Sequence, residues 1–483
     1  MLFNSYQYLI FLPLVWLLYW HVFKPLRWQN LFLLVASYVF YGWWDWRFLA
    51  LIVITSACSY ASGLAIRRLQ DAGRRRAAWW VSAANIVFNL GILATFKYYN
   101  FFVESAEELL AVFGVHMDWP TANLILPVGI SFYTFQALSY SIDVYKGKIA
   151  PTRDMVAFFA FICFFPQLVA GPIERATNLL PQILKARRFD HATAVDGLRQ
   201  VLWGLVKKMV VADSCAMAVN RVWAAPDNFS SLTLLLGAVL FSFQIYCDFS
   251  GYSDIAIGSA KLFGIKLMRN FSVPYFSRNM SEFWRRWHIS LLTWFRDYVY
   301  IPLGGSRCSQ WKIIRNVFVV YLLSGLWHGA NWTFILWGVF HAVLILAYRF
   351  LGFNAKHKEI VAHNSSLPNL KEAFSMVVTF ILATIGWVLF RAETIADAWH
   401  YFTCLFTRSM FDLGSMDVGK KALVLCLVLL VVDWIGRKRE HPLQFDGNGL
   451  MRHRACRWAL YYGLIAAIIF LQGHQEAFIY FQF

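Results

Sequence analysis

The longest stretch without a charged residue, NVFVVYLLSGLWHGANWTFILWGVFHAVLILAY, runs from Asn316 to Tyr348 and is bounded by Arg315 and Arg349. A helix needs about 20 apolar residues to cross a bilayer, so this stretch is too long for one crossing and barely long enough for two. We expect a break between Ser324 and Ala330, where two glycines weaken the helix. The stretch therefore predicts a helical hairpin within a membrane.

The composition of the whole chain also indicates that much of it lies in a lipid bilayer. Of 483 residues, 59% are hydrophobic and 15% are charged, whereas soluble proteins have roughly 45–50% and 25%. This excludes disorder, a coiled coil and a disulfide-stapled secreted domain. The net charge of +17 is typical of basic cytoplasmic loops in a membrane protein, and we expect no nucleic-acid partner. The eight cysteines form no CxxC pair and no zinc-like spacing with histidine, so no metal site is expected.

Basic residues indicate how the chain is threaded. A cluster follows the apolar run 49–66, which places that gap in the cytoplasm by the positive-inside rule: Arg67, Arg68, Arg74, Arg75 and Arg76. Counting from it puts the N-terminus outside, with residues 6–20 as the first span because they lack a basic start and a cleavage site. The basic loop 437–457 makes the last run, 458–471, cross outward, so both termini are expected outside. Residues 155–171 end at Gly171-Pro172 and fit a re-entrant segment.

Two histidines stand out among the twelve. His328 lies in the glycine-broken hairpin, far in sequence from any charge, and an ionisable group at such depth is a functional candidate; the alternative is a hydrogen-bonded core histidine. His288 lies in SEFWRRWHIS (281–290), where aromatic residues alternate with arginine. That segment is either an anchoring helix at the membrane surface or a guanidinium-rich mouth for an anionic ligand, with His288 facing inward.

A third cluster, QIYCDFSGYSD (244–254), places Asp248 and Asp254 in an apolar region. An unpaired buried charge is costly, so we expect both carboxylates to pair with nearby arginines rather than to act in catalysis. The chain contains no GxSxG, P-loop or HExxH motif.

The tail FIYFQF (478–483) follows the last span directly. Its aromatic residues are either an interfacial anchor, which is common for Tyr and Phe, or a setting for Tyr480 as a reachable hydroxyl that accepts an acyl group.

On these residues the chain resembles the membrane-bound O-acyltransferases (MBOAT), in the bacterial branch that acetylates polysaccharides. The resemblance rests on SEFWRRWHISLLTWFRDYVYIPLGG (281–305), GLWHGANWTFILWG (325–338) and QIYCDFSGYSDIAIG (244–258), with supporting segments over nearly the whole chain. It implies one integral-membrane domain over residues 1–483, with a catalytic core at 244–348 and a last span with an outward-facing tail at 458–483. It further implies an all-α polytopic fold with roughly ten to twelve spans and re-entrant helices around a central tunnel.

The resemblance also implies chemistry. His328 would be the catalytic base and His288 its partner, orienting the acyl carbonyl or stabilising the oxyanion. Acetyl-CoA would be the donor substrate, no cofactor would be bound, and Arg285, Arg286 and Arg296 would meet the donor's phosphates. The tail resembles the C-terminal aromatic–Tyr motif of envelope acyltransferase systems, in which such a tyrosine is implicated as a covalent acyl carrier, so Tyr480 would relay the acyl group.

The expected protein is thus a bacterial inner-membrane enzyme that moves acetyl groups outward to a polysaccharide, with alginate or a similar exopolysaccharide as first choice. Because the chain carries no extracytoplasmic hydrolase-like domain, a periplasmic SGNH-type acetyltransferase partner is expected. Two alternatives are a D-alanyl transferase of the same family and a polysaccharide or lipid transporter without acyl chemistry.

Overall fold

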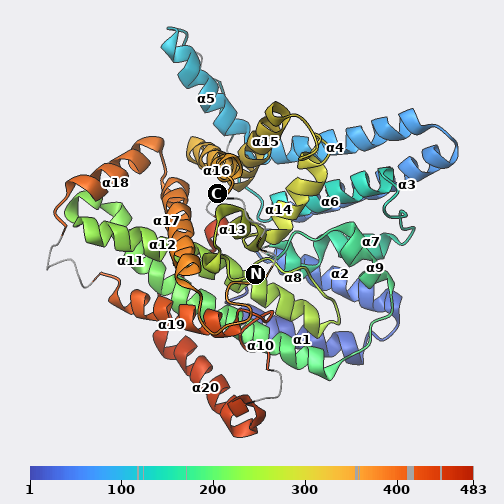
Figure 1. Cartoon of the computed structure of the whole chain (residues 1–483). Helices are drawn as coiled ribbons and strands as arrows, with labels where there is room; N and C mark the ends of the chain where they lie inside the picture. Colours follow the sequence, from blue (N-terminus) through green and yellow to red (C-terminus); the bar gives the residue numbers. More distant parts are fainter. Residues whose placement is uncertain are drawn as a thin grey trace. The chain divides into compact units, whose positions relative to one another are not determined.

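A computed structural model describes residues 1–116, 119–122, 124–169, 171–353, 357, 359–410, 418–445 and 449–481. Every regular element in these ranges is a helix, from α1 (Tyr6–His21) to η8 (Ile479–Phe481), which confirms the all-α class (Figure 1). The chain divides into two compact units. Unit 1 contains residues 1–194 and 259–268, and unit 2 contains residues 195–258 and 269–483.

Six helices in the described ranges are long and apolar enough to cross a membrane. They are η1 with α3 (Trp46–Asp71), α4 (Arg75–Lys97), α12 (Ser231–Leu262), α16 (Trp332–Phe350), α17 (Leu370–Arg391) and α20 (Arg454–Leu471). Four further apolar helices have 16 or 17 residues, near the lower limit for a span: α1, α2 (Leu26–Gly42), α6 (Ile130–Tyr145) and α19 (Lys420–Gly436). The chain is a polytopic membrane protein, and the total of ten to twelve spans stays a prediction.

In unit 1, α3, α4 and α6 pack against one another. Polar side chains on their buried faces bond to each other, as when Asn89 Nδ2 donates to Asn85 Oδ1 at 3.2 Å. The segment expected to be re-entrant is a broken helix: α7 (Met155–Cys163) ends at Phe164, and α8 (Phe165–Leu168) follows at once. Asp154 caps α7 by accepting from the backbone N–H of Ala157 at 3.0 Å. Both short helices are buried in protein, as broken backbone at membrane depth requires.

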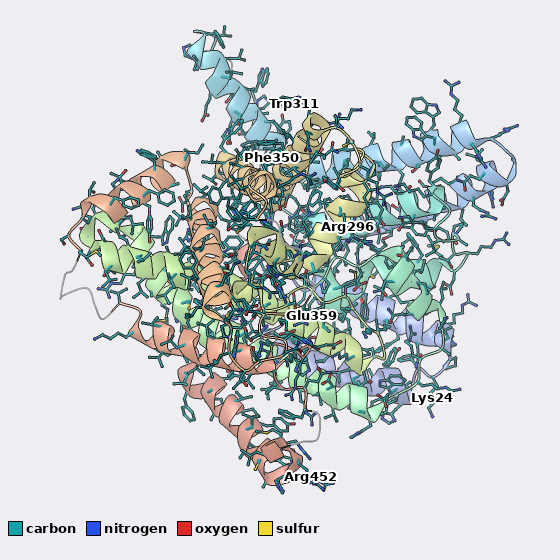
Figure 2. The ribbon with its side chains drawn as sticks, in the orientation of Figure 1. Lys24, Arg296, Trp311, Phe350, Glu359 and Arg452 are labelled. Carbon is teal, nitrogen blue, oxygen red and sulfur yellow. The ribbon has the colours of Figure 1, made fainter. Side chains whose placement is uncertain are left out.

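Unit 2 holds the hairpin that the uncharged stretch predicts. Helices α15 (Gln310–His328) and α16 pack along each other, and Trp311 and Phe350 mark the open end of the pair (Figure 2). The turn lies at residues 329–331, and Asn331 caps α16 by accepting from the backbone N–H of Thr333 at 2.9 Å. The break is therefore where the sequence predicts it.

The expectation that two glycines weaken the helix at this break is only partly right. Gly325 lies inside α15 and does not interrupt it. A Cβ atom at Gly325 would overlap the carbonyl oxygen of Phe334, and one at Gly338 would overlap the carbonyl oxygen of Tyr321. These glycines let the two helices approach at backbone distance, as small residues do between membrane helices.

Besides the hairpin and most of α12, the described residues of unit 2 form further α- and π-helical segments. In chain order they are α10 from residue 195 (His191–Leu205), the π-helical segment η2 (Val206–Ala212), α11 (Asp213–Ala224), α13 (Met280–Arg286), α14 (Ile289–Phe295), η5 (Arg296–Tyr300), α17, α18 (Ile395–Thr407), α19 and α20. Helix α17 begins with a capping box in which Asn369 and Glu372 bond to each other's backbone N–H.

Candidate active site

His288 lies at a sharp backbone turn between α13 and α14. Its φ of +43° is in the left-handed region, which bulky side chains rarely adopt. Asn279 caps α13 before the turn, and after it the backbone N–H of Ile289 donates to the carbonyl oxygen of Asn270 at 2.9 Å. Such strain persists only where the surroundings over-determine it, and it is typical of functional sites.

Asn270 decides which ring nitrogen of His288 carries the proton. Asn270 Oδ1 accepts from the backbone N–H of Ser290 at 3.4 Å and from Ser290 Oγ at 2.9 Å, and it lies 3.1 Å from His288 Nδ1. A backbone N–H can only donate, so the Asn270 atom that faces it is the oxygen. His288 Nδ1 must therefore donate, which leaves the lone pair on Nε2.

The other nitrogen of His288 is available for chemistry. Nε2 is buried and has no hydrogen-bond partner. His288 lies outside the six candidate spans, and burial lowers its pKa to about 3. The imidazole is therefore neutral near pH 7 and presents an acceptor, not a donor. Sequence reasoning missed Asn270, which no motif singled out.

His328 is the last residue of α15 and is 3% exposed. Aromatic rings enclose it: the ring centroids of Trp327, Trp337 and Phe390 lie 5.1, 5.1 and 5.2 Å from its own. Because these rings come from α15, α16 and α17, the position of His328 is set by the packing of three long helices.

The tail folds into unit 2 instead of lying at an interface. Phe478 is 0% exposed and Ile479 is 4% exposed, so the interfacial-anchor alternative is wrong for the described part of the tail. Tyr480 is half-buried, and its hydroxyl is buried without a hydrogen-bond partner. Burial raises the pKa of Tyr480 well above its usual value, so the phenol needs a base to react. The last two residues of the sequence, Gln482 and Phe483, lie outside the described residues.

The three residues singled out for catalysis lie together. The ring centroid of Tyr480 is 5.5 Å from that of His328 and 6.4 Å from that of His288, and the two histidine rings are 6.4 Å apart. Tyr480 lies 192 positions after His288 in the sequence, so only the fold brings the three residues together. The cluster combines a phenolic hydroxyl with two imidazoles, and these are groups that acyl transfer to a hydroxyl can use.

Comparison with known proteins identifies the fold that holds this cluster. The model of the membrane-bound O-acyltransferase family matches residues 151–386. A probable alginate O-acetylase, AlgI, of Pseudomonas aeruginosa is 40% identical over 457 residues, which cover 92% of this chain and 83% of that protein. The chain belongs to the membrane-bound O-acyltransferase family. A peptidoglycan O-acetyltransferase of Helicobacter pylori is 33% identical, with 82% of this chain and 78% of that protein covered.

Family membership makes the chain a membrane O-acyltransferase, which confirms the expected enzyme class and removes the transporter alternative. A teichoic acid D-alanyltransferase of Bacillus subtilis is also similar, at 30% identity, but the match covers only 57% of this chain and 71% of that protein. The acetylating relatives are thus matched over more of the MBOAT chain than the alanylating one.

The three arginines expected at the donor differ in their surroundings. Arg286 is buried and bonds Glu282 at 2.7 Å, and Arg296 bonds the adjacent Asp297 at 2.7 Å (Arg296 is labelled in Figure 2). Their charges are already partly neutralised. Arg285 is exposed, and its guanidinium donates to the carbonyl oxygen of His357 at 3.5 Å. Of the three, Arg285 is the best placed to meet an anion.

The carboxylates of the third cluster pair with lysines, which corrects the expected arginine partners. Asp254 lies 2.6 Å from Lys207 Nζ, and Asp248 lies 2.8 Å from Lys208 Nζ. Both lysines belong to η2, in the apolar run VKKMVVA. Two adjacent lysines in such a run are the signal that could have found this network.

A separate group on η3 (Pro226–Asn228) and α18 has metal-binding side chains. Asp227, His400 and Cys404 bring their ligand atoms within 4.8 Å of one another. Arg408 also pairs with Asp227, and His400 Nε2 lies 2.9 Å from Asp227 Oδ2. The group is therefore an ion-pair cluster at which Asp227 meets both His400 and Arg408.

Proposed function

We propose that this MBOAT enzyme transfers acetyl groups from cytosolic acetyl-CoA, across the inner membrane, for O-acetylation of an extracytoplasmic polysaccharide. The observation that carries the proposal is the triangle of neighbouring rings formed by His288, His328 and Tyr480. The acetylating function is supported by relatives named for O-acetylation, which match most of the chain. Alginate or a similar exopolysaccharide is the acceptor that the most similar of these relatives suggest.

In the first proposed step His328 is the general base. Its ring is closer to Tyr480 than that of His288 is, and it takes the phenol proton as the tyrosyl oxygen attacks the thioester carbonyl. The C–S bond breaks, the CoA thiolate leaves, and the imidazolium of His328 returns the proton to it. The products are CoA and an acetyl ester on Tyr480.

His288 has a different task. Its Nε2 carries a lone pair, so it cannot donate to an oxyanion as a neutral imidazole. We assign it to accept a hydrogen bond from an O–H or N–H group of a substrate and so to fix that substrate against His328. Arg285 would meet the phosphates of the donor.

The second proposed step passes the acetyl group outward. A cavity of about 220 Å³ lies beside the tail and is lined by polar groups of Asn220, Gln244, Arg391 and Glu476. Amide, guanidinium and carboxylate groups are suited to an acceptor rich in hydroxyls. A periplasmic SGNH-type partner would take the acetyl group from Tyr480 and place it on the polymer.

The test is a single-turnover reaction of the purified protein with acetyl-CoA labelled in the acetyl group. Peptide mass spectrometry should find the label on Tyr480, and chromatography should find one CoA released per label, which avoids interference from the protein's own thiols. His328→Ala should lose at least 100-fold in labelling rate, whereas the exposed His453→Ala should not change it. Label retained by His328→Ala would refute its role as base, and equal labelling from a D-alanyl thioester would favour the alanylating alternative.

A further inference from the structure

A buried ammonium group lies beneath the segment that carries Tyr480. Lys208 Nζ lies 2.8 Å from Asp213 Oδ1, 2.8 Å from Asp248 Oδ1 and 3.0 Å from the carbonyl oxygen of Glu476. The ammonium donates hydrogen bonds to Asp213 and to the Glu476 carbonyl, and it forms an ion pair with Asp248. The oxygens of the two carboxylates can accept more hydrogen bonds than one ammonium donates, so they can also accept from other N–H groups. Such a cluster in an apolar interior is costly unless it is fully bonded.

The segment before Tyr480 supplies the missing partners from its backbone. The N–H of Ile479 donates to Asp248 Oδ2 at 2.7 Å. The N–H of Gly473 donates to the carbonyl oxygen of Met209 in η2 at 2.9 Å. With the Glu476 carbonyl on Lys208, residues 473–479 are therefore held at the start, middle and end by main-chain groups.

Aromatic side chains of α12 complete the contact. The ring of Phe478 lies 4.3 Å from that of Tyr252 and 5.9 Å from that of Phe249, and the ring of Tyr480 lies 4.5 Å from that of Phe249. Asp248 lies on the same helix, so α12 presents a carboxylate and two aromatic rings to the segment.

We propose that Lys208, Asp213, Asp248, Phe249 and Tyr252 form a docking socket for the peptide segment 473–480, and that its occupancy places the Tyr480 hydroxyl at His328. The ligand class is an extended peptide that offers backbone N–H groups and alternate aromatic side chains. The bond from Ile479 fixes a backbone atom one residue before Tyr480, which sets the reach of the hydroxyl. The consequence for acyl transfer rests on the proposed function, whereas the docking does not.

Gly473→Ala tests the socket without altering any charge. A Cβ at Gly473 would lie 2.5 Å from the backbone nitrogen of Ser214 and 2.6 Å from the backbone oxygen of Asp213, neither of which can move aside. Gly463→Ala is the matched control, because a Cβ there meets nothing within 4 Å. Hydrogen exchange of the peptide containing residues 474–480 reports docking directly.

A second variant, Asp248→Ala, removes the acceptor of the Ile479 N–H and leaves Lys208 paired one-to-one with Asp213. Loss of a buried hydrogen bond to a charged group should speed exchange of the tail roughly 10- to 150-fold in Asp248→Ala. In Gly473→Ala the overlap of the new Cβ with the backbone of residues 213 and 214 should also speed tail exchange. Acetyl labelling of Tyr480 at saturating acetyl-CoA should fall by the same range, with the half-saturating acetyl-CoA concentration unchanged, a split that general destabilisation would not produce.

The outcomes separate the two proposals. Unchanged tail exchange in both Gly473→Ala and Asp248→Ala would overturn the socket. Fast exchange with undiminished labelling of Tyr480 would overturn the claim that docking positions the hydroxyl. A protected tail in the unaltered protein with no label on Tyr480 would refute the proposed relay and leave the socket standing.

Discussion

Replacing Asn270 by alanine should reduce acyl transfer by roughly 10- to 150-fold. The change removes the buried acceptor that lies 3.1 Å from His288 Nδ1 and 2.9 Å from Ser290 Oγ. A buried hydrogen bond of this kind contributes about 1.5–3 kcal/mol when its loss leaves a donor unpaired, and each 1.36 kcal/mol is a factor of ten in rate. Stability should fall by ~2–4 kcal/mol, because two donors lose one partner.

Asn270→Asp gives the sharper result, since it keeps the shape and adds a negative charge beside His288. An adjacent carboxylate favours the imidazolium, so it raises the pKa of His288 from its buried value of about 3. If neutral His288 is required, the acid limb of the rate–pH profile should move to higher pH in this variant and stay in place in Asn270→Ala. The profile is measured as CoA release at saturating acetyl-CoA from pH 5 to 8.

A buried asparagine elsewhere provides the control. Asn30 is 1% exposed and donates to the carbonyl oxygen of Ile183 at 3.0 Å within unit 1. Asn30→Ala should cost similar stability and leave the rate–pH profile unchanged. An unshifted profile in Asn270→Asp, or an undiminished rate in Asn270→Ala, would refute the assignment of the His288 tautomer to Asn270.

Three further predictions concern single residues. The pKa of His288 is about 3 in the native state and about 6.5 in the unfolded chain, so below pH 6.5 only the unfolded state binds the extra proton. Native stability should therefore drop by up to ~1.4 kcal/mol per pH unit below pH 6.5. His288→Gln should flatten the dependence of the melting temperature on pH. Gly325→Ala should overpack the α15–α16 hairpin and cost about 1–3 kcal/mol in thermal unfolding, and an unchanged melting temperature would contradict the close approach. Arg285→Gln should raise the KM for acetyl-CoA several-fold with little change in kcat, and the opposite split would remove Arg285 from the donor site.

The sequence predicted the parts of the site that depend on local pattern. The uncharged stretch 316–348 located the hairpin and His328, because hydrophobic length and a break in it are readable without tertiary information. Asn270 and Lys208 were missed because their roles arise only when distant segments meet: Asn270 lies 18 positions from His288, and Lys208 lies 40 from Asp248. The arginine partners predicted for Asp248 and Asp254 were wrong for the same reason, since sequence proximity does not fix which cation a helix turns toward them.

The sequence also did not predict that the C-terminal tail is buried. Charge in the loops predicts on which side of the membrane an end of the chain lies, but it does not say whether a short aromatic segment stays at that surface. Phe478 is fully buried because its ring finds Tyr252 and Phe249 and because the backbone beside it satisfies a carboxylate that would otherwise lack an N–H donor. The composition of the tail alone favours a position at the membrane interface, but specific hydrogen bonds and ring contacts hold the tail inside the protein.

A tyrosine is also chemically suited to stand between a thioester and a sugar. The ease with which an acyl group leaves follows the acidity of the group it leaves behind, and the thiol and phenol reference pKa values are about 8.5 and 10, with an alkyl hydroxyl well above both. In the proposed relay, the ester on Tyr480 keeps the acyl group activated, because a phenol is a far better leaving group than an alkyl hydroxyl, and transfer from it to a polymer hydroxyl is favourable. Burial raises the pKa of Tyr480 further, so the phenol does not ionise by itself, and the proposed relay requires a base such as His328 to take its proton. If the proposed relay holds, main-chain bonds from the segment before Tyr480 to a buried charge cluster would couple the acyl acceptor to the base, and would disfavour acyl transfer to water or to a misplaced hydroxyl.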